Sequence, residues 1–175
     1  MRATSTELAE EYEPVSFSLE HHGPMDVLFR SAFGQPLSKD TFLNRYNTAP
    51  VGKAVVGYIA FHRATGTPAA YYGVFPVQLQ YGGRTFWAAQ SGDTMTHGDH
   101  RKRGLFTWLA KLTYEACTQQ GIELVFGMPN ANSYPGFINK LGWKETDTIA
   151  CYDLKPAIKT FPLPKLLPRF AMTWA

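Results

Sequence analysis

The stretch HGDHRKRGLFTWLAKL, residues 97–112, puts three basic side chains and a glycine directly before an apolar helical pattern. Apolar residues then recur at steps of four, three and four, which predicts a helix over residues 104–120. The first amides of a helix are unpaired donors, and its dipole adds up to ~2 kcal/mol for an anion bound there. The pattern indicates an anion site, the alternative being a solvated basic surface. The residues expected to hold the anion are Arg101, Lys102, Arg103, Gly104, Leu105 and Phe106.

The elements around this turn predict an α/β (α+β) fold. An antiparallel meander fills residues 54–96, with one tight turn at Gly82 and Gly83. The strand that ends near Thr96, the basic turn, the helix and a short strand at 122–126 form a βαβ unit, so its two strands should be parallel. The other elements expected are a strand at 15–19, helices at 23–34, 39–46 and 133–141, and a last strand at 149–154.

Composition limits the function classes. A chain of 175 residues that is 45% hydrophobic and 18% charged reads as one globular domain. Its net charge of +3 gives no bulk argument for a nucleic-acid or membrane partner. The first 15 residues lack the apolar segment of a signal peptide, and no run approaches a membrane span. Because Cys117 and Cys151 have no zinc-site or disulfide spacing, we expect no metal and a cytoplasmic location.

The segment HGDHRKRGLF is similar to the acyl-CoA pyrophosphate signature (R/Q)xxGx(G/A) of the GNAT superfamily of N-acetyltransferases. Arg101 and Gly104 stand in its two leading positions. The element order over residues 15–154, about four fifths of the chain, resembles the same family. Two residues depart from the pattern. Phe106 replaces a Gly or Ala, so that either its side chain crowds the phosphate loop or only its amide contacts the phosphate, and Gly98 stands where relatives often have Pro.

Two segments, SGDTMTHGDHRKRGLF and FGMPNANSYPGFINKLGW, are particularly similar to GNAT proteins of bacterial amino-sugar and polysaccharide biosynthesis. The resemblance implies a GNAT-like acyltransferase domain over residues 1–155. It has a mostly antiparallel central sheet flanked by helices, and its parallel βαβ unit lies at the CoA-binding cleft. The co-substrate implied is acetyl-CoA, with its pantetheine arm near Met95 and Thr96. A glycine suited to a bulge, Gly92, lies just upstream.

The resemblance also implies direct acyl transfer, for which the amine must lose a proton and a thiolate must leave. Asp93 is the candidate base or water-positioning group, or else it caps a turn, and His97 is the second candidate. The family's tyrosine acid has Ile138 in its place, so Tyr134, one helical turn earlier, is the candidate acid, the alternative being a structural tyrosine. The remaining candidates, as pantetheine contacts or helix caps, are Asn130 and Asn132.

The tail, residues 156–175, is apolar and rich in proline, so it should dock on its own domain or on another subunit of a homo-oligomer, or begin a further region. The leading interpretation is an acetyl-CoA-dependent N-acetyltransferase that acts on a primary amine of a small molecule, such as an amino sugar or a nucleotide-linked amino sugar. The alternative is a non-catalytic GNAT-like domain that binds CoA or a partner. A nucleic-acid module is disfavoured, because aromatic residues do not interleave with the basic turn.

Overall fold

The computed structural model describes residues 4–147, and its main compact unit, Met1–Lys144, carries the fold. Five strands form one sheet in the order β1-β2-β3-β4-β5. All neighbours are antiparallel except β4 and β5, which are parallel, as predicted. The helices and strands are α1 (Ser5–Glu11), β1 (Tyr12–Ser16), α2 (His22–Phe33), α3 (Lys39–Tyr46), β2 (Val56–His62), β3 (Pro68–Tyr81), β4 (Arg84–Thr96), α4 (Leu105–Gln119), β5 (Ile122–Gly127) and α5 (Tyr134–Leu141), with 3-10 turns at Leu19–His21, Ala49–Val51 and Gly98–His100.

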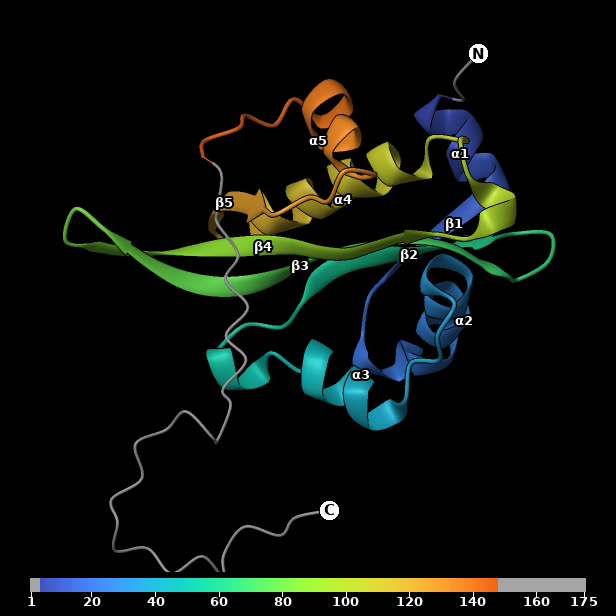
Figure 1. Ribbon diagram of the computed structural model, residues 1–175, viewed down its shortest axis with the longest axis horizontal. Coiled ribbons are helices and arrows are strands. Elements are labelled where there is room, and N and C mark those ends of the chain that lie inside the picture. The colour runs from blue at the N-terminus through green and yellow to red at the C-terminus, as the bar shows by residue number, and fades with distance from the viewer. Residues whose placement is uncertain (1–3, 148–175) are drawn as a thin grey trace, which may run out of the picture. The chain divides into compact units, whose positions relative to one another are not determined.

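Helices cover both faces of the sheet (Figure 1). Helices α1, α4 and α5 lie on one face, and α2 and α3 lie on the other. Each face has its own core. The α4 side is built around Tyr72, Leu105 and Leu109, and the opposite side around Phe42 and Tyr71. The sheet therefore separates two packed layers. Because successive side chains of a strand point to opposite faces, neighbouring residues of β3 or β4 face different layers.

The N-terminal segment differs from the prediction. A strand was expected at 15–19, but β1 ends at Ser16 and Leu19 begins a 3-10 turn. Helix α1 was not predicted. Its signal is a capping box, because the Thr4 side chain accepts from the Glu7 amide and the Glu7 carboxylate accepts from the Thr4 amide. The buried Leu8 then holds the short helix against the core.

A β-bulge interrupts β4 next to Gly92, where the sequence favoured one. Tyr71 is in register with Met95 and Gly73 with Gly92, so two residues of β4 oppose Tyr72 alone. One of the two, Asp93, has a left-handed φ of 53°. The bulge turns the end of β4 away from regular pairing, and the site described below begins at this point.

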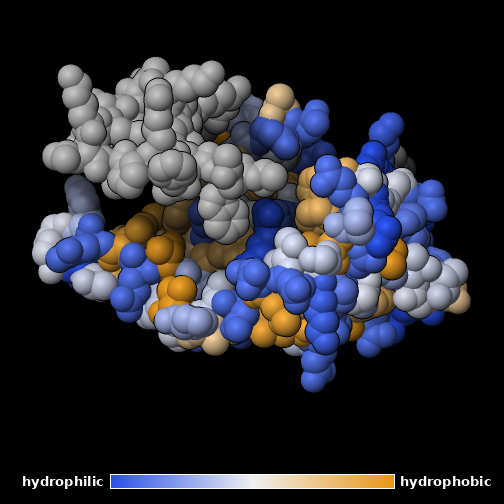
Figure 2. Space-filling view, turned by 60° about the horizontal axis from the view of Figure 1, so that its bottom comes forward, coloured by the Kyte–Doolittle hydropathy of each residue, from blue (hydrophilic) through white to orange (hydrophobic). Residues whose placement is uncertain are grey.

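Surface polarity is mixed on the face seen in Figure 2, where hydrophobic groups alternate with hydrophilic ones. Among the residues that the structure describes, no helix is long and apolar enough to cross a membrane. The predicted strand at 149–154, the domain boundary at 155, Cys151 and the tail at 156–175 lie outside the described residues.

Candidate functional site

A cavity of about 830 Å³ opens where the two parallel strands part. Their pairing ends at Ser91 and Gly127, after which β4 and β5 diverge. Residues 91–96 form one wall, and residues 127–130 begin the other. Crevices at the carboxyl ends of parallel strands are common ligand sites. The lining is completed by Phe106 at the start of α4, by Asn132 and Ser133 in the turn before α5, by Pro135, Gly136, Phe137 and Lys140 of α5, and by Ala32 and Phe33 of α2.

The wall formed by β4 offers backbone groups to a ligand. From Gly92 to Thr96 the strand has no register partner on β5, so its edge is open toward the cavity. The Met95 side chain is buried in the core on the α3 side of the sheet, which leaves its main chain for the cavity. A Cβ on Gly127 would lie 3.2 Å from the Trp143 ring, so this indole lies behind the opposite wall.

A smaller cavity of about 200 Å³ lies at the basic turn. Arg101, Lys102 and Lys140 line it, and no carboxylate does. Thr96, Arg101, Phe106 and Lys140 line both cavities, so the smaller one continues from the larger. The arrangement is a groove with a positive end, suited to an anion at that end.

The turn itself presents amides to this end. Lys102 and Gly104 have left-handed φ values of 65° and 100°. Gly104 is the N-cap of α4 and provides no side-chain cap, so the first amides of a 15-residue helix stay available. A Cβ on Gly104 would meet only the Leu8 side chain, at 3.7 Å, so the positive φ explains this glycine better than close approach of a ligand.

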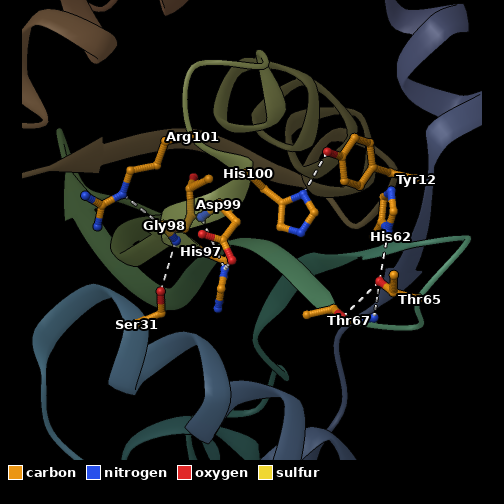
Figure 3. Close-up of polar contacts among 11 residues, drawn as sticks. Tyr12, Ser31, His62, Thr65, Thr67, His97, Gly98, Asp99, His100 and Arg101 are labelled. Carbon is orange, nitrogen blue, oxygen red and sulfur yellow. Dashed lines mark hydrogen bonds and ion pairs between the residues drawn. The ribbon is translucent and has the colours of Figure 1, made fainter.

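Contacts with neighbouring elements hold the turn in place (Figure 3). The Gly98 amide donates to Ser31 Oγ of α2 at 3.0 Å. The Tyr12 hydroxyl and His100 Nδ1 are hydrogen-bonded at 2.9 Å. Burial, and then the nearby His62, Arg103 and His97, lower the pKa of His100 below its usual value, because all of these disfavour a further positive charge.

Two of the residues predicted to hold the anion, Arg103 and Phe106, contact neighbouring side chains. Arg103 forms an ion pair with Glu11 and lines neither cavity. The Phe106 ring packs edge-on against Phe137 and Tyr72, with ring centroids 5.2 and 5.5 Å away, and it lines both cavities. Its bulk therefore forms part of the cavity wall, and its amide remains at the start of α4.

Asp93 lines the larger cavity but not the smaller one at the basic turn, and its carboxylate is already paired. Arg45 of α3 forms an ion pair with its carboxylate, and the Tyr46 hydroxyl donates to Oδ2 at 2.9 Å. The Asp93 side chain is only 9% exposed. Burial, then the charge of Asp93, raise the pKa of Tyr46, so this phenol stays a donor. Together these two contacts hold the carboxylate in one direction.

The other predicted catalytic side chains do not line the cavities. His97 lies within the 3-10 turn region, where its Nδ1 accepts from the Asp99 amide at 3.4 Å (Figure 3). Tyr134 begins α5, is 39% exposed and is absent from both linings. Asn130 lines the larger cavity and also caps the turn before α5, since its Oδ1 accepts from the Asn132 and Ser133 amides at 3.1 Å.

Sequence reasoning missed Ser91 and Lys140. Lys140 lies in the last turn of α5, and only the packing of α5 beside α4 brings it to both cavities. Ser91 lies in β4 between Gln90 and Gly92, and nothing in the local sequence distinguished it from the other polar residues of that strand. Neither position carries a motif, so no spacing rule singled them out.

Comparison with known families agrees with this geometry. The model of the acetyltransferase (GNAT) domain matches residues 25–146. The chain belongs to the GNAT family. This membership confirms the predicted enzyme class, an N-acetyltransferase, and the mixed sheet confirms the predicted fold class. No curated protein matches the chain.

Solved structures with the GNAT fold resemble the chain at low identity. A Trypanosoma brucei acetyltransferase is 19% identical, with a TM-score of 0.64 over 82% of this chain and 100% of that one. Glucosamine-6-phosphate N-acetyltransferase from Arabidopsis thaliana is 14% identical, with a TM-score of 0.64 over 82% and 99%. A predicted acetyltransferase with acetyl-CoA from Clostridium acetobutylicum is 13% identical, with a TM-score of 0.66 over 81% and 96%.

Proposed function

We propose that the protein transfers an acetyl group from acetyl-CoA directly to a primary amine of a small molecule. The observation that carries this proposal is the continuous groove between the basic turn and Asp93. It offers a positive end for phosphates, an open strand edge for an amide-rich arm and a polar far end for an amine. An amino sugar, free or nucleotide-linked, is the acceptor class that we propose, since glucosamine-6-phosphate N-acetyltransferase is among the similar structures.

The residues present suit acetyl-CoA. In this proposal the pyrophosphate accepts hydrogen bonds from the amides of residues 102–106, and Arg101, Lys102 and Lys140 neutralise its charge. The pantetheine amides pair with the open edge of β4 at Met95 and Thr96, as an added strand would. Asn130 and Asn132 line the opposite wall. Arg103 does not contact the pyrophosphate in this proposal, because its guanidinium forms an ion pair with Glu11.

At the far end we assign Asp93 to the amine. Because Arg45 and Tyr46 hold the carboxylate in place, Asp93 is suited to orient the amine and a water molecule that takes its proton. The nitrogen lone pair then attacks the thioester carbon, the C–N bond forms, and the C–S pair leaves with sulfur. His97 and Tyr134, which line neither cavity, have no assigned role in this proposal.

Turnover of acetyl-CoA with a panel of amines tests the proposed function. The panel contains amino sugars, their phosphates, nucleotide-linked amino sugars, aminoglycosides and polyamines, and release of the CoA thiol is measured with each amine. We expect at least one amine to raise thiol release well above hydrolysis, with an equal amount of N-acetylated product by mass spectrometry. CoA binding without turnover of any amine would overturn the proposal.

That outcome would favour the second candidate, a non-catalytic domain that binds CoA or a partner. The observation behind it is Ile138 in the place of the family's tyrosine acid, together with the absence of Tyr134 from the cavity lining.

A cytoplasmic location is also part of the proposal. The buried free thiol of Cys117, whose pKa burial raises to about 11, is compatible with a reducing compartment.

A further inference from the structure

A chain of hydrogen bonds runs from the larger cavity into the core. Ser91 Oγ lies 3.1 Å from the Tyr72 hydroxyl, which lies 2.7 Å from the Tyr114 hydroxyl. Trp143 Nε1 donates to the Tyr114 hydroxyl at 2.9 Å. Ser91, Tyr72 and Tyr114 lie in β4, β3 and α4, respectively. Trp143 directly follows Gly142, the C-cap residue of α5. Buried polar groups are costly unless paired, and here the pairing ends at a residue that lines the cavity.

The position of Ser91 places it near the reacting end of the co-substrate, an inference that rests on the proposed function. Ser91 is the last β4 residue in register with β5, so it stands where the strands part. It lies five residues before Thr96, roughly 16 Å along the strand at about 3.3 Å per residue. A pantetheine arm that starts at the basic turn and follows β4 ends at this point, with its sulfur beside Ser91.

The donors and acceptors in this chain of hydrogen bonds allow two arrangements. An indole N–H only donates, whereas each hydroxyl both donates and accepts. In the first arrangement Ser91 donates to Tyr72 and Tyr72 to Tyr114. If the hydroxyls rotate together, Tyr114 donates to Tyr72 and Tyr72 to Ser91, which frees the Ser91 hydrogen for the cavity. Trp143 donates to Tyr114 in both arrangements.

Both phenols remain donors under working conditions. Burial raises the pKa of Tyr72 and, as the largest cause, that of Tyr114, so neither loses its proton near neutral pH. Tyr72 is fully buried, and its ring is fixed against Phe106 and Tyr114. The chain is therefore a rigid set of donors directed toward one cavity residue.

We propose that Ser91 donates a hydrogen bond to the sulfur of acetyl-CoA as the C–S bond breaks. The amine nitrogen supplies the electron pair of the new C–N bond, and the C–S pair goes to sulfur. The proton from nitrogen goes to water, and the thiolate stays hydrogen-bonded to Ser91 until solvent protonates it. Only hydroxyl rotations occur along the chain. Ser91 is a catalytic residue, and Tyr72, Tyr114 and Trp143 are positioning residues.

Ser91→Val and Ser91→Thr form a matched pair, because the two side chains have the same shape and only Thr keeps the hydroxyl. We expect Ser91→Val to lower kcat about 10- to 100-fold, the scale for losing a donor to a developing anion. Acetyl-CoA affinity by calorimetry should stay within about threefold, because the hydrogen bond strengthens only as sulfur becomes anionic. Ser91→Thr should keep most of kcat. Equal rates for the two variants would overturn the role of the hydroxyl.

Tyr72→Phe tests the positioning part. It should lower kcat about 3- to 10-fold in the wild-type background and have no further effect on Ser91→Val, since the two residues act through one hydrogen bond. Tyr71→Phe is the control, because the Tyr71 hydroxyl is also buried but has no hydrogen-bond partner among the described residues. It should leave kcat unchanged. Equal effects of Tyr72→Phe in both backgrounds would overturn the chain.

The proposed function and the role of Ser91 fail in different ways. A wild-type enzyme that turns over no amine overturns the proposed function, and with it the role of Ser91. A wild-type enzyme that turns over an amine, with Ser91→Val equally fast, overturns only the role of Ser91. Circular dichroism of each variant, together with its CoA affinity, shows whether the fold and the groove are intact.

Discussion

The basic end of the groove leaves its charges available, whereas at the Asp93 end the charge is already paired. In the described part of the chain, Arg101, Lys102 and Lys140 form no ion pair. Asp93, by contrast, contacts both Arg45 and Tyr46. The two ends thus differ in what they still offer a ligand.

The two ends of the groove are therefore suited to different tasks: the basic end to attracting a phosphate, and the Asp93 end to orienting a small group. Free cations and helix amides attract a phosphate over several ångströms and tolerate some freedom in its placement. A carboxylate held from two sides has little freedom left, so it is suited to fix the direction of one small group. Changes at the basic end should therefore alter affinity, and changes at the Asp93 end should alter turnover.

The largest expected effect is the loss of CoA binding in Gly104→Glu. The side chain strains a backbone at φ 100°, and its carboxylate lies beside the helix amides, where it repels phosphate. We expect CoA affinity, measured by calorimetry, to fall at least about 100-fold. Gly82→Glu is the matched control, because Gly82 also has a left-handed φ, of 58°, but lies in the β3–β4 turn. Unchanged CoA affinity in a folded Gly104→Glu protein would contradict the assignment of the pyrophosphate to the start of α4.

At the Asp93 end, Asp93→Asn should lower turnover about 100-fold while CoA affinity is kept, since an amide no longer orients the amine and its water. Raising the pH should recover part of the loss by supplying free amine. Arg45→Gln should also lower turnover, about 10-fold, because it releases the carboxylate from its fixed position. An inactive Asp93→Asn beside a fully active Arg45→Gln would instead identify Asp93 as an independent base.

A smaller effect is expected from Lys140→Ala. Its ammonium lines both cavities but is exposed, so its removal should weaken CoA binding about 3- to 10-fold at low salt. The difference should shrink as ionic strength rises, because salt screens exposed charges. Lys111→Ala, on the exposed face of α4, is the control. A salt-independent loss, or an equal loss in the control, would contradict the role of Lys140.

The smallest effect concerns stability and pH. The pKa of His100 is lowered in the folded protein, chiefly by burial, so the unfolded chain binds the extra proton more readily. The stabilising contribution is complete above the usual value of 6.5 and is lost as the pH falls toward the folded pKa. His100→Gln should therefore show a shallower decline in unfolding free energy as the pH falls below the usual value of 6.5. An identical decline in both proteins would show that His100 does not contribute to the pH dependence of stability.

Local sequence was sufficient for the basic end and for most of the fold. Helix α4, its glycine N-cap and the adjacent charges lie within about twenty residues, and helix periodicity and unpaired amides depend on near neighbours. The parallel pairing of β4 and β5 follows from the helix that connects them. The capping box at Thr4 and Glu7 was equally local, so α1 was readable although it was not predicted.

Only the tertiary structure decided which side chains meet. Asp93 reaches Tyr46 across 47 residues, and Tyr114 reaches Tyr72 across 42. The same packing pairs Arg103 with Glu11 and turns the Phe106 ring into the cavity wall. These contacts depend on sheet register and on the packing of helices against each face, where a shift of one residue moves a side chain to the opposite face. Residue types alone carry no such register, so the sequence showed which groups are present and the fold decided which of them act together.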